Sequence, residues 1–272
     1  MSRFLKKLYV VLIVIFMYAP IAVMIVQSFN QSKSRGHWTG FTLEWYISLF
    51  SDESIMAALR NTLTIALLSS LIATAISLLA CLAIRQMTKN TRTVVMGITN
   101  IPMLNADIVT GISMMLLFLS MGIKFGYGSI LIAHITFNIP YVILNIMPRL
   151  NSLDNSCFEA ARDLGASPVY AFFHVVLPDL MPGVMSGMLM AFTMSIDDFI
   201  ITHFTKGAGV DTLSTKIYTE VRKGIKPEMY ALSTLIFGAI LILLLLLNFT
   251  KNGSRKKNKT GTNAPSILEI AP

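Results

Sequence analysis

The stretch SCFEAARDLGASPVYAFFHVVLP, residues 156–178, is a helix-forming insert in a chain made mostly of apolar segments. Ser156 and Glu159 have the Ser-x-x-Glu spacing of a capping box, in which each side chain accepts a backbone N–H of the other residue. This spacing predicts a helix that begins at Cys157 and ends at Gly165. A plainer interpretation of Glu159 is that it does no more than cap this helix.

A second short helix is predicted directly after the glycine. Ser167 supplies an N-cap hydroxyl, and Pro168 suits the first helical position because an N–H there would have no helical partner. Pro178 is expected to close this helix, since a proline interrupts the hydrogen bonds of a helix interior. The insert is therefore predicted to be two short helices joined by a glycine turn.

The insert also carries a longer pattern. Glu159-Ala160-Ala161 is followed by Gly165 and then by Val175-x-Leu177-Pro178, and this resembles the EAA loop of permease subunits of binding-protein-dependent ABC importers. In that family the loop is cytoplasmic and docks a short coupling helix into a groove of the ATPase subunit. The resemblance implies that one set of residues couples this chain to an ATPase dimer: Glu159, Ala160, Ala161, Leu164 and Gly165.

The composition indicates a membrane protein. Apolar residues make up 54% of the chain and charged residues only 13%, and several apolar runs reach the roughly 20 residues that cross a bilayer. We therefore expect an all-α polytopic protein with about six transmembrane helices, which the family resemblance makes an ABC type I importer permease fold. The expected spans are 8–29, 61–84, 93–121, 129–147, 179–203 and 231–249. The third is expected to be interrupted by Ile101-Pro102 and then by Asn105-Ala106-Asp107.

Basic flanks suggest the orientation. Lys and Arg residues concentrate in residues 1–7 and 251–272, and such residues favour the cytoplasmic side. The expected organisation is a basic cytoplasmic N-terminus at 1–7, a transmembrane permease domain at 8–250 with a cytoplasmic coupling loop at 150–178, and a basic cytoplasmic tail at 251–272. The family implies a bacterial inner membrane, with membrane lipid around the spans.

Catalysis by this chain is not expected. The sequence contains no Gly-x-x-x-x-Gly-Lys-Ser/Thr motif, so ATP and Mg²⁺ would be bound by a partner ATPase and the chain itself would be no enzyme. The histidines at 37, 134, 174 and 203 are scattered without ligand spacing, so neither a metal nor another cofactor is expected. No nucleic-acid partner is expected either.

Three acidic residues fall inside predicted spans. Asp107, Asp197 and Asp198 would each cost at least ~2.5–3.5 kcal/mol at a span centre, so they are expected to face a pathway or a partner. On straight helices all three would lie at similar depth, and no basic residue in the third or fifth span would neutralise them. This pattern favours a cationic substrate, although each acid could instead cap a helix or join two helices.

The two neighbouring acids would point about 100° apart on a continuous helix. Asp197 would share a stripe with Ser186, Met190 and Thr193, and Asp198 would share one with Gly187, Ala191, Ser195 and Thr202. Either stripe could line a pathway. A short helix around Trp45 is expected at the outer membrane surface. Trp45 itself is interpreted as an interfacial belt residue or as an aromatic wall on which a cation stacks.

The stretch SIDDFIITHF at 195–204 resembles the Asp-Asp segment of permeases from spermidine/putrescine importers, in particular the second of their two permeases. Such systems combine two different permeases, two ATPase copies and a periplasmic substrate-binding protein. The resemblance implies a polyamine substrate whose ammonium groups contact Asp197, Asp198 and Ser195. Three alternatives stay open: an ABC permease for another solute, a secondary transporter for an organic cation, and a membrane-embedded scaffold.

Overall fold

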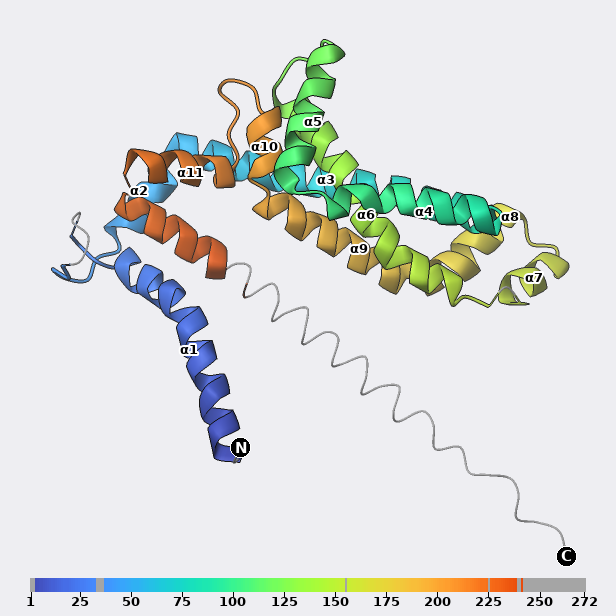
Figure 1. The fold of residues 1–272 in the computed structure, drawn as a ribbon, viewed down its shortest axis with the longest axis horizontal. Helices are drawn as coiled ribbons and strands as arrows, with labels where there is room; N and C mark the ends of the chain where they lie inside the picture. Colours follow the sequence, from blue (N-terminus) through green and yellow to red (C-terminus); the bar gives the residue numbers. More distant parts are fainter. Residues whose placement is uncertain (1–2, 33–36, 155, 225, 239–240, 242–272) are drawn as a thin grey trace, which may run out of the picture. The chain divides into compact units, whose positions relative to one another are not determined.

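The computed structural model describes residues 3–32, 37–154, 156–224, 226–238 and 241 (Figure 1). Within these ranges the regular structure is helical, apart from one isolated β-bridge between Asn30 and Phe41. The expectation of an all-α chain is confirmed. The chain divides into two compact units, Met1–Asp52 with Glu220–Pro272, and Glu53–Thr219. Each unit is described by itself.

The first unit contains the N-terminal helix α1 (Arg3–Ser28) and the short helix α2 (Glu44–Ser51). The apolar stretch of α1 from Lys7 to Ser28 is long enough to cross a membrane, and all of it except the buried Ser28 is exposed or partly exposed. A helix with apolar side chains exposed all round suits lipid or a partner helix. A further helix at 227–238 belongs to this unit.

The second unit is built around three long helices, α3 (Glu53–Gln86), α6 (Tyr127–Asn151) and α9 (Leu177–Asp197). Their shared core includes Cys81, Val142, Ile146, Leu150 and Leu180, all fully buried. Gly187 permits close approach, because a Cβ there would lie 3.0 Å from Val142 Cγ1. Small residues at such seams let helix backbones come close together, as is common between membrane helices.

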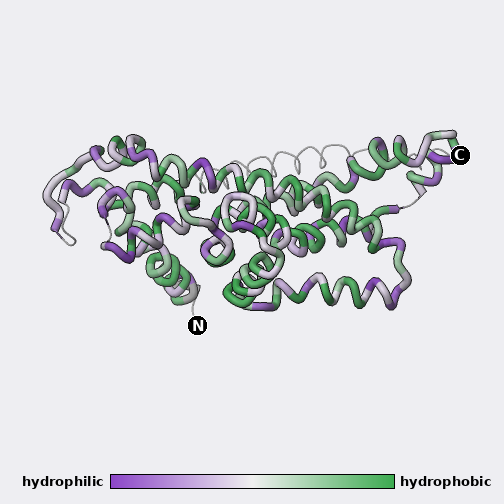
Figure 2. The backbone as a smooth tube through the Cα atoms, turned by 90° about the horizontal axis from the view of Figure 1, so that it is seen from above, coloured by the Kyte–Doolittle hydropathy of each residue, from purple (hydrophilic) through white to green (hydrophobic). Residues whose placement is uncertain are grey.

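The long helices are largely hydrophobic, and hydrophilic residues gather toward helix ends and connections (Figure 2). Four helices within the described ranges are long and apolar enough to span a membrane, with a fifth span possible if a bent pair counts as one. The four are Lys7–Ser28, Glu53–Gln86, Tyr127–Asn151 and Pro168–Asp197. The sixth expected span, at 231–249, lies mostly outside the described residues.

The interruption expected in the third span is confirmed, and it is a sharp bend between two helices. The segment forms α4 (Lys89–Leu104) and α5 (Asp107–Ser120), which meet at an angle of 105°. Asn105 and Ala106 adopt extended backbone conformations between the two helices. The break follows Pro102, whose ring and missing N–H weaken the last turn of α4.

The predicted first helix of the insert is present as α7 (Ser156–Asp163), and Gly165 turns the chain with a φ of +89°. Helix α8 (Pro168–Ala171) follows, with the Ser167 hydroxyl accepting the Tyr170 N–H at 3.2 Å. The glycine turn and the serine cap are therefore confirmed. The capping box is replaced by a different start: Ser156 donates both its N–H and its hydroxyl to Asp154 Oδ1.

Pro178 does not close the second helix as expected. The backbone continues from α8 through a π-helical segment, η1 (Phe172–Val176), directly into α9. The π turn changes the hydrogen-bond register just before Pro178, which then falls in the first turn of α9. A proline is tolerated at that position because no α-helical partner awaits its N–H. The second helix of the insert and the fifth span are thus one continuous element.

Candidate functional site

Asp198 follows directly after α9 and caps the next helix, α10 (Ile200–Thr205). Its carboxylate accepts the N–H groups of Ile201 at 3.2 Å and Thr202 at 2.8 Å, and the Thr202 hydroxyl at 2.9 Å. The side chain is only 8% exposed. These bonds satisfy the free N–H groups at the start of α10 and explain why the helix restarts here.

His134, on α6, completes a buried polar cluster around this carboxylate. Its Nε2 lies 2.9 Å from Thr202 Oγ1 and 3.4 Å from Asp198 Oδ2, and its Nδ1 hydrogen-bonds with Ser195 Oγ. Ser195 also lies 3.1 Å from the hydroxyl of Ser69 on α3. We call His134, Asp198, Ser195, Thr202 and Ser69 the polar lock, because it ties α3, α6, α9 and α10 together.

The sequence reasoning missed His134. It treated the four histidines as scattered, whereas one of them lies inside a span and is 1% exposed. An ionisable residue in the middle of an apolar span was the available signal. The pairing of positions 134 and 198 could not be read from spacing, because it depends on how α6 packs against α9.

The two stripes predicted for the fifth span have opposite surroundings. Gly187, Ala191 and Ser195 are buried inside the unit, as is Thr202. Ser186, Met190, Thr193 and Asp197 are exposed. Because α9 ends at Asp197, Asp198 and Thr202 do not lie on successive turns of one helix. They are in contact because the Asp198 carboxylate accepts the N–H and the hydroxyl of Thr202. The stripe that ends in Asp197 is therefore the one exposed on the surface of this unit.

Asp107 is the first residue of α5 and is exposed. The bend before α5 removes the straight helix on which its predicted depth rested. One turn later, a Cβ on Gly111 would lie 3.0 Å from Phe204 Cδ2, so α5 packs closely on α10. The polar lock that holds α10 therefore also positions α5.

Trp45 lies on α2, in the first unit. It is 6% exposed, and its indole Nε1 donates to the carbonyl oxygen of Asn30 at 2.7 Å. The short helix predicted around it is confirmed. The ring is buried, and its role in the substrate pathway stays a prediction.

The predicted coupling residues lie at the tip of the insert. Leu164 is 89% exposed, and Glu159, Ala160 and Gly165 are exposed as well. Further along the insert, three more large apolar side chains are exposed: Val169, Tyr170 and Phe173. Exposed apolar patches mark protein–protein or membrane interaction sites, and the role of this tip in coupling stays a prediction. We call Leu164, Val169, Tyr170 and Phe173 the docking patch.

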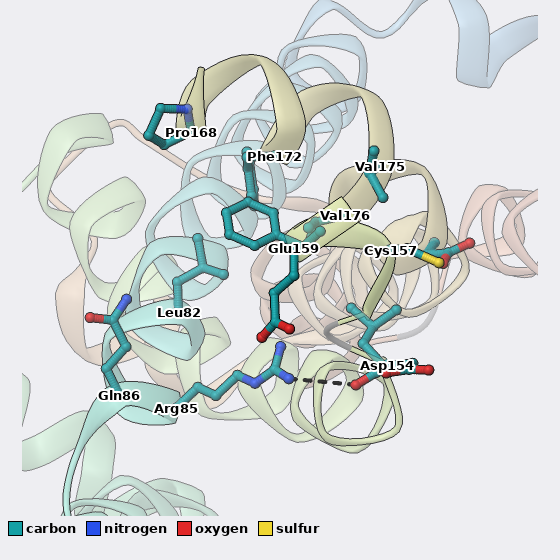
Figure 3. Close-up of a pocket in the computed structure, with 13 residues that line it drawn as sticks. Leu82, Arg85, Gln86, Asp154, Cys157, Glu159, Pro168, Phe172, Val175 and Val176 are labelled. Carbon is teal, nitrogen blue, oxygen red and sulfur yellow. Dashed lines mark hydrogen bonds between the residues drawn. The ribbon is translucent and has the colours of Figure 1, made fainter. Parts of the chain in front are cut away.

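A cavity of about 520 Å³ lies behind this patch, between the end of α3 and the insert (Figure 3). Its lining includes Leu82 and Arg85 of α3, Glu159 of α7 and Phe172 of η1. Arg85 donates to the carbonyl oxygen of Leu153 at 3.5 Å, and Figure 3 shows the carboxylate of Glu159 directed toward the Arg85 guanidinium. Glu159 therefore lines the cavity on the side that faces the end of α3.

The start of α7 carries its own charge. Hydrogen bonds from the hydroxyl and the backbone N–H of Ser156 hold the pKa of Asp154 below its ordinary value. A carboxylate that remains ionised at the N-terminus of a helix also interacts favourably with the helix dipole. The insert is therefore anchored at its first turn.

The spanning bundle and the insert together define a class, the permeases of ABC type I importers. A crystal structure of a bacterial ABC transporter that imports the acidic polysaccharide alginate matches with a TM-score of 0.67 over 91% of this chain and 92% of that one. The sequence identity is 19%, so this likeness concerns the fold. The inward-facing MetNI methionine ABC transporter matches with a TM-score of 0.57 over 74% of this chain and 96% of that one, at 19% identity.

Residues 75–252 match the family described as binding-protein-dependent transport system inner membrane component, and the chain belongs to this family. It is 35% identical to the spermidine/putrescine transport system permease protein PotC of Haemophilus influenzae, over 95% of this chain and all of that protein. It is 38% identical to the putrescine transport system permease protein PotI of Escherichia coli K12, over 83% of each chain. The family resemblance stated from the insert is confirmed, and the chain is a multi-pass inner-membrane permease subunit.

Proposed function

We propose that this chain is a permease subunit of an ATP-driven importer that moves polyamines, spermidine or putrescine, into the cytoplasm. The observation that carries the proposal is the pair of open carboxylates, Asp107 and Asp197, on otherwise apolar spans. Within the described residues neither carboxylate forms an ion pair with a lysine, arginine or histidine. Unpaired acids at a pathway attract cations and repel anions, and the relatives named for spermidine and putrescine narrow the cation to a polyamine.

The proposed mechanism is alternating access. A periplasmic binding protein delivers the polyamine to the outer mouth, between this chain and a second, homologous permease. The carboxylates replace water around the ammonium groups without holding them too tightly, because the cargo must also leave. The docking patch receives an ATPase dimer that binds ATP and Mg²⁺, and ATP-driven closure of that dimer moves the insert and the helices joined to it.

This assignment gives an orientation. The insert at 150–178 and both termini would lie in the cytoplasm, and Asp107 and Asp197 would lie toward the outer mouth. The continuity of α8, η1 and α9 supports the coupling step, since a movement of the docking patch passes along one helix to Asp197. The basic tail at 251–272 lies outside the described residues.

The test is uptake of labelled spermidine and putrescine by cells that express the complete transport system. We expect Asp107→Asn and Asp197→Asn to reduce uptake at least about tenfold, because each removes a charge that the ammonium groups meet. The amount of assembled complex in the membrane is measured in parallel. Unchanged uptake by both variants, in a normally assembled complex, would show that these acids do not contact the cargo.

A further inference from the structure

The open edge between α6 and α9 carries neutral polar groups in addition to the acids. Asn145 of α6 bridges the two helices: its Nδ2 lies 3.2 Å from Met190 Sδ, and its Oδ1 accepts the Ser186 hydroxyl at 3.2 Å. Nδ2 also donates to the Tyr141 carbonyl oxygen at 2.8 Å. Ser186 and Met190 are exposed and Asn145 is partly exposed.

The helix seam explains why these groups meet. A Cβ on Gly187 would lie 3.3 Å from Asn145 Cβ, and a Cβ on Gly183 would lie 3.2 Å from the Asn145 carbonyl oxygen. The two glycines therefore let α9 approach α6 closely at this residue. The close approach places the Asn145 amide at the open surface beside Ser186 and Met190, and not beneath them.

The same face leads to Asp197. Ser186, Met190, Thr193 and Asp197 recur at helical spacing and are all exposed. With a rise of 1.5 Å per residue, Met190 lies about 10 Å and Ser186 about 16 Å along the axis from Asp197. Both lie on the side of Asp197 that leads toward the insert.

The chemistry changes along this face. Asp197 supplies a full negative charge, whereas α9 carries no charged residue between Asp179 and Asp197. Asn145 and Ser186 offer neutral oxygen acceptors, and Met190 offers an apolar, polarisable surface. An ammonium group can donate hydrogen bonds to these neutral oxygens, and the methylenes of the polyamine can pack on the thioether. The cation is held there less strongly than by a carboxylate.

We propose that Asn145, Ser186 and Met190 form a neutral inner subsite, which takes the leading ammonium group of the polyamine after Asp197 and releases it toward the cytoplasm. This inference rests on the proposed function and extends it from the outer acids to the release step. The competing explanation is that the three residues only join α6 to α9, as interhelical hydrogen bonds do in many membrane proteins. The two explanations differ in what a negative charge at position 145 would do.

The experiment uses the complete transporter in liposomes, with both permeases, the ATPase and the binding protein. ATP-driven uptake of labelled spermidine, ATP hydrolysis and the time for which the complex retains spermidine are measured. Asn145→Asp should lengthen retention and slow uptake about tenfold, because a carboxylate binds an ammonium group more strongly than an amide does. Ser186→Ala should lower uptake severalfold without lengthening retention, because it only removes an acceptor.

The matched control is Ser113→Ala. Ser113 is an exposed serine of α5 whose hydroxyl donates to the Val109 carbonyl oxygen of its own helix at 2.7 Å. If Asn145→Asp and Ser186→Ala both behave like this control, the inner subsite is wrong and the proposed function stands. If Asn145→Asp fails to assemble, Ser186→Ala decides alone. If the wild-type transporter imports no polyamine, the proposed function itself fails and the subsite fails with it.

Discussion

Asp197 and Asp198 are adjacent in the sequence, but their surroundings differ. The Asp197 carboxylate is exposed at the end of α9, whereas the Asp198 side chain is 8% exposed and accepts three hydrogen bonds. A buried carboxylate already engaged by backbone, hydroxyl and imidazole groups is less accessible to an ammonium group than an exposed one. We therefore assign Asp198 to positioning α10 and Asp197 to the cargo.

This assignment predicts different defects for the two asparagine variants. Asp198→Asn should destabilise the purified permease by about 1.5–3 kcal/mol, the range for lost hydrogen bonds to a charged group. Asp197→Asn should leave the thermal unfolding midpoint close to that of the wild type and reduce polyamine uptake. Unfolding in detergent and uptake in liposomes measure the two effects separately. Equal midpoints for both variants would contradict a structural role for Asp198.

His134 should be required for the same reason. His134→Leu leaves the buried hydroxyls of Ser195 and Thr202 and the Asp198 carboxylate without their shared partner, at a cost of about 3 kcal/mol or more. The level of folded permease in the membrane and its unfolding midpoint should both fall.

Thr136→Ala is the matched control for His134→Leu. Thr136 lies half a turn further along α6 and is exposed, and its hydroxyl donates to the Ile132 carbonyl oxygen of its own helix at 2.9 Å. His134→Gln should recover part of the stability, since an amide can still meet two hydroxyls. Wild-type stability of His134→Leu would show that the polar lock is dispensable.

Among the elements, the insert shows what local rules can predict. The turn at Gly165 and the cap at Ser167 were predictable, because each depends on residues within about four positions. The continuation of the helix through Pro178 was not, because it depends on the π segment that precedes it. The interruption before Asp107 was visible at Pro102 and at Asn105-Ala106-Asp107, but the angle of the bend was not.

Gly165→Ala tests the turn. At a φ of +89° an alanine is strained by roughly 1 kcal/mol or more, so the relation between α7 and α8 should shift. We expect ATP hydrolysis to become less dependent on substrate and uptake to fall severalfold. Gly128→Ala is the control, because Gly128 lies in the first turn of α6 with open space around its Cα. A Gly165→Ala transporter with normal coupling would remove the turn from the mechanism.

At the scale of the whole molecule, most of the candidate site depends on contacts between distant segments. The acids at 107 and 197 were identified from hydropathy alone, because a carboxylate in an apolar span is conspicuous. Which of the two adjacent acids is open could not be predicted, because the choice depends on α9 ending at Asp197 and on His134 meeting Asp198 from α6. The proposed neutral inner subsite could not be predicted from the sequence either, because its members come from two spans.

The docking patch makes the last prediction, which concerns assembly. Its members are apolar and exposed, with Leu164 at 89%, so a partner would bind it mainly by removing apolar surface from water. Leu164→Asp should reduce co-purification of the ATPase at least about tenfold while the permease itself still folds, because the side chain packs on little of its own chain. Leu164→Met keeps an apolar side chain of similar volume and should retain the ATPase. Because the patch is uncharged, wild-type association should also persist at high salt, where exposed ion pairs weaken. Full retention of the ATPase by Leu164→Asp would place the coupling contact elsewhere on the chain.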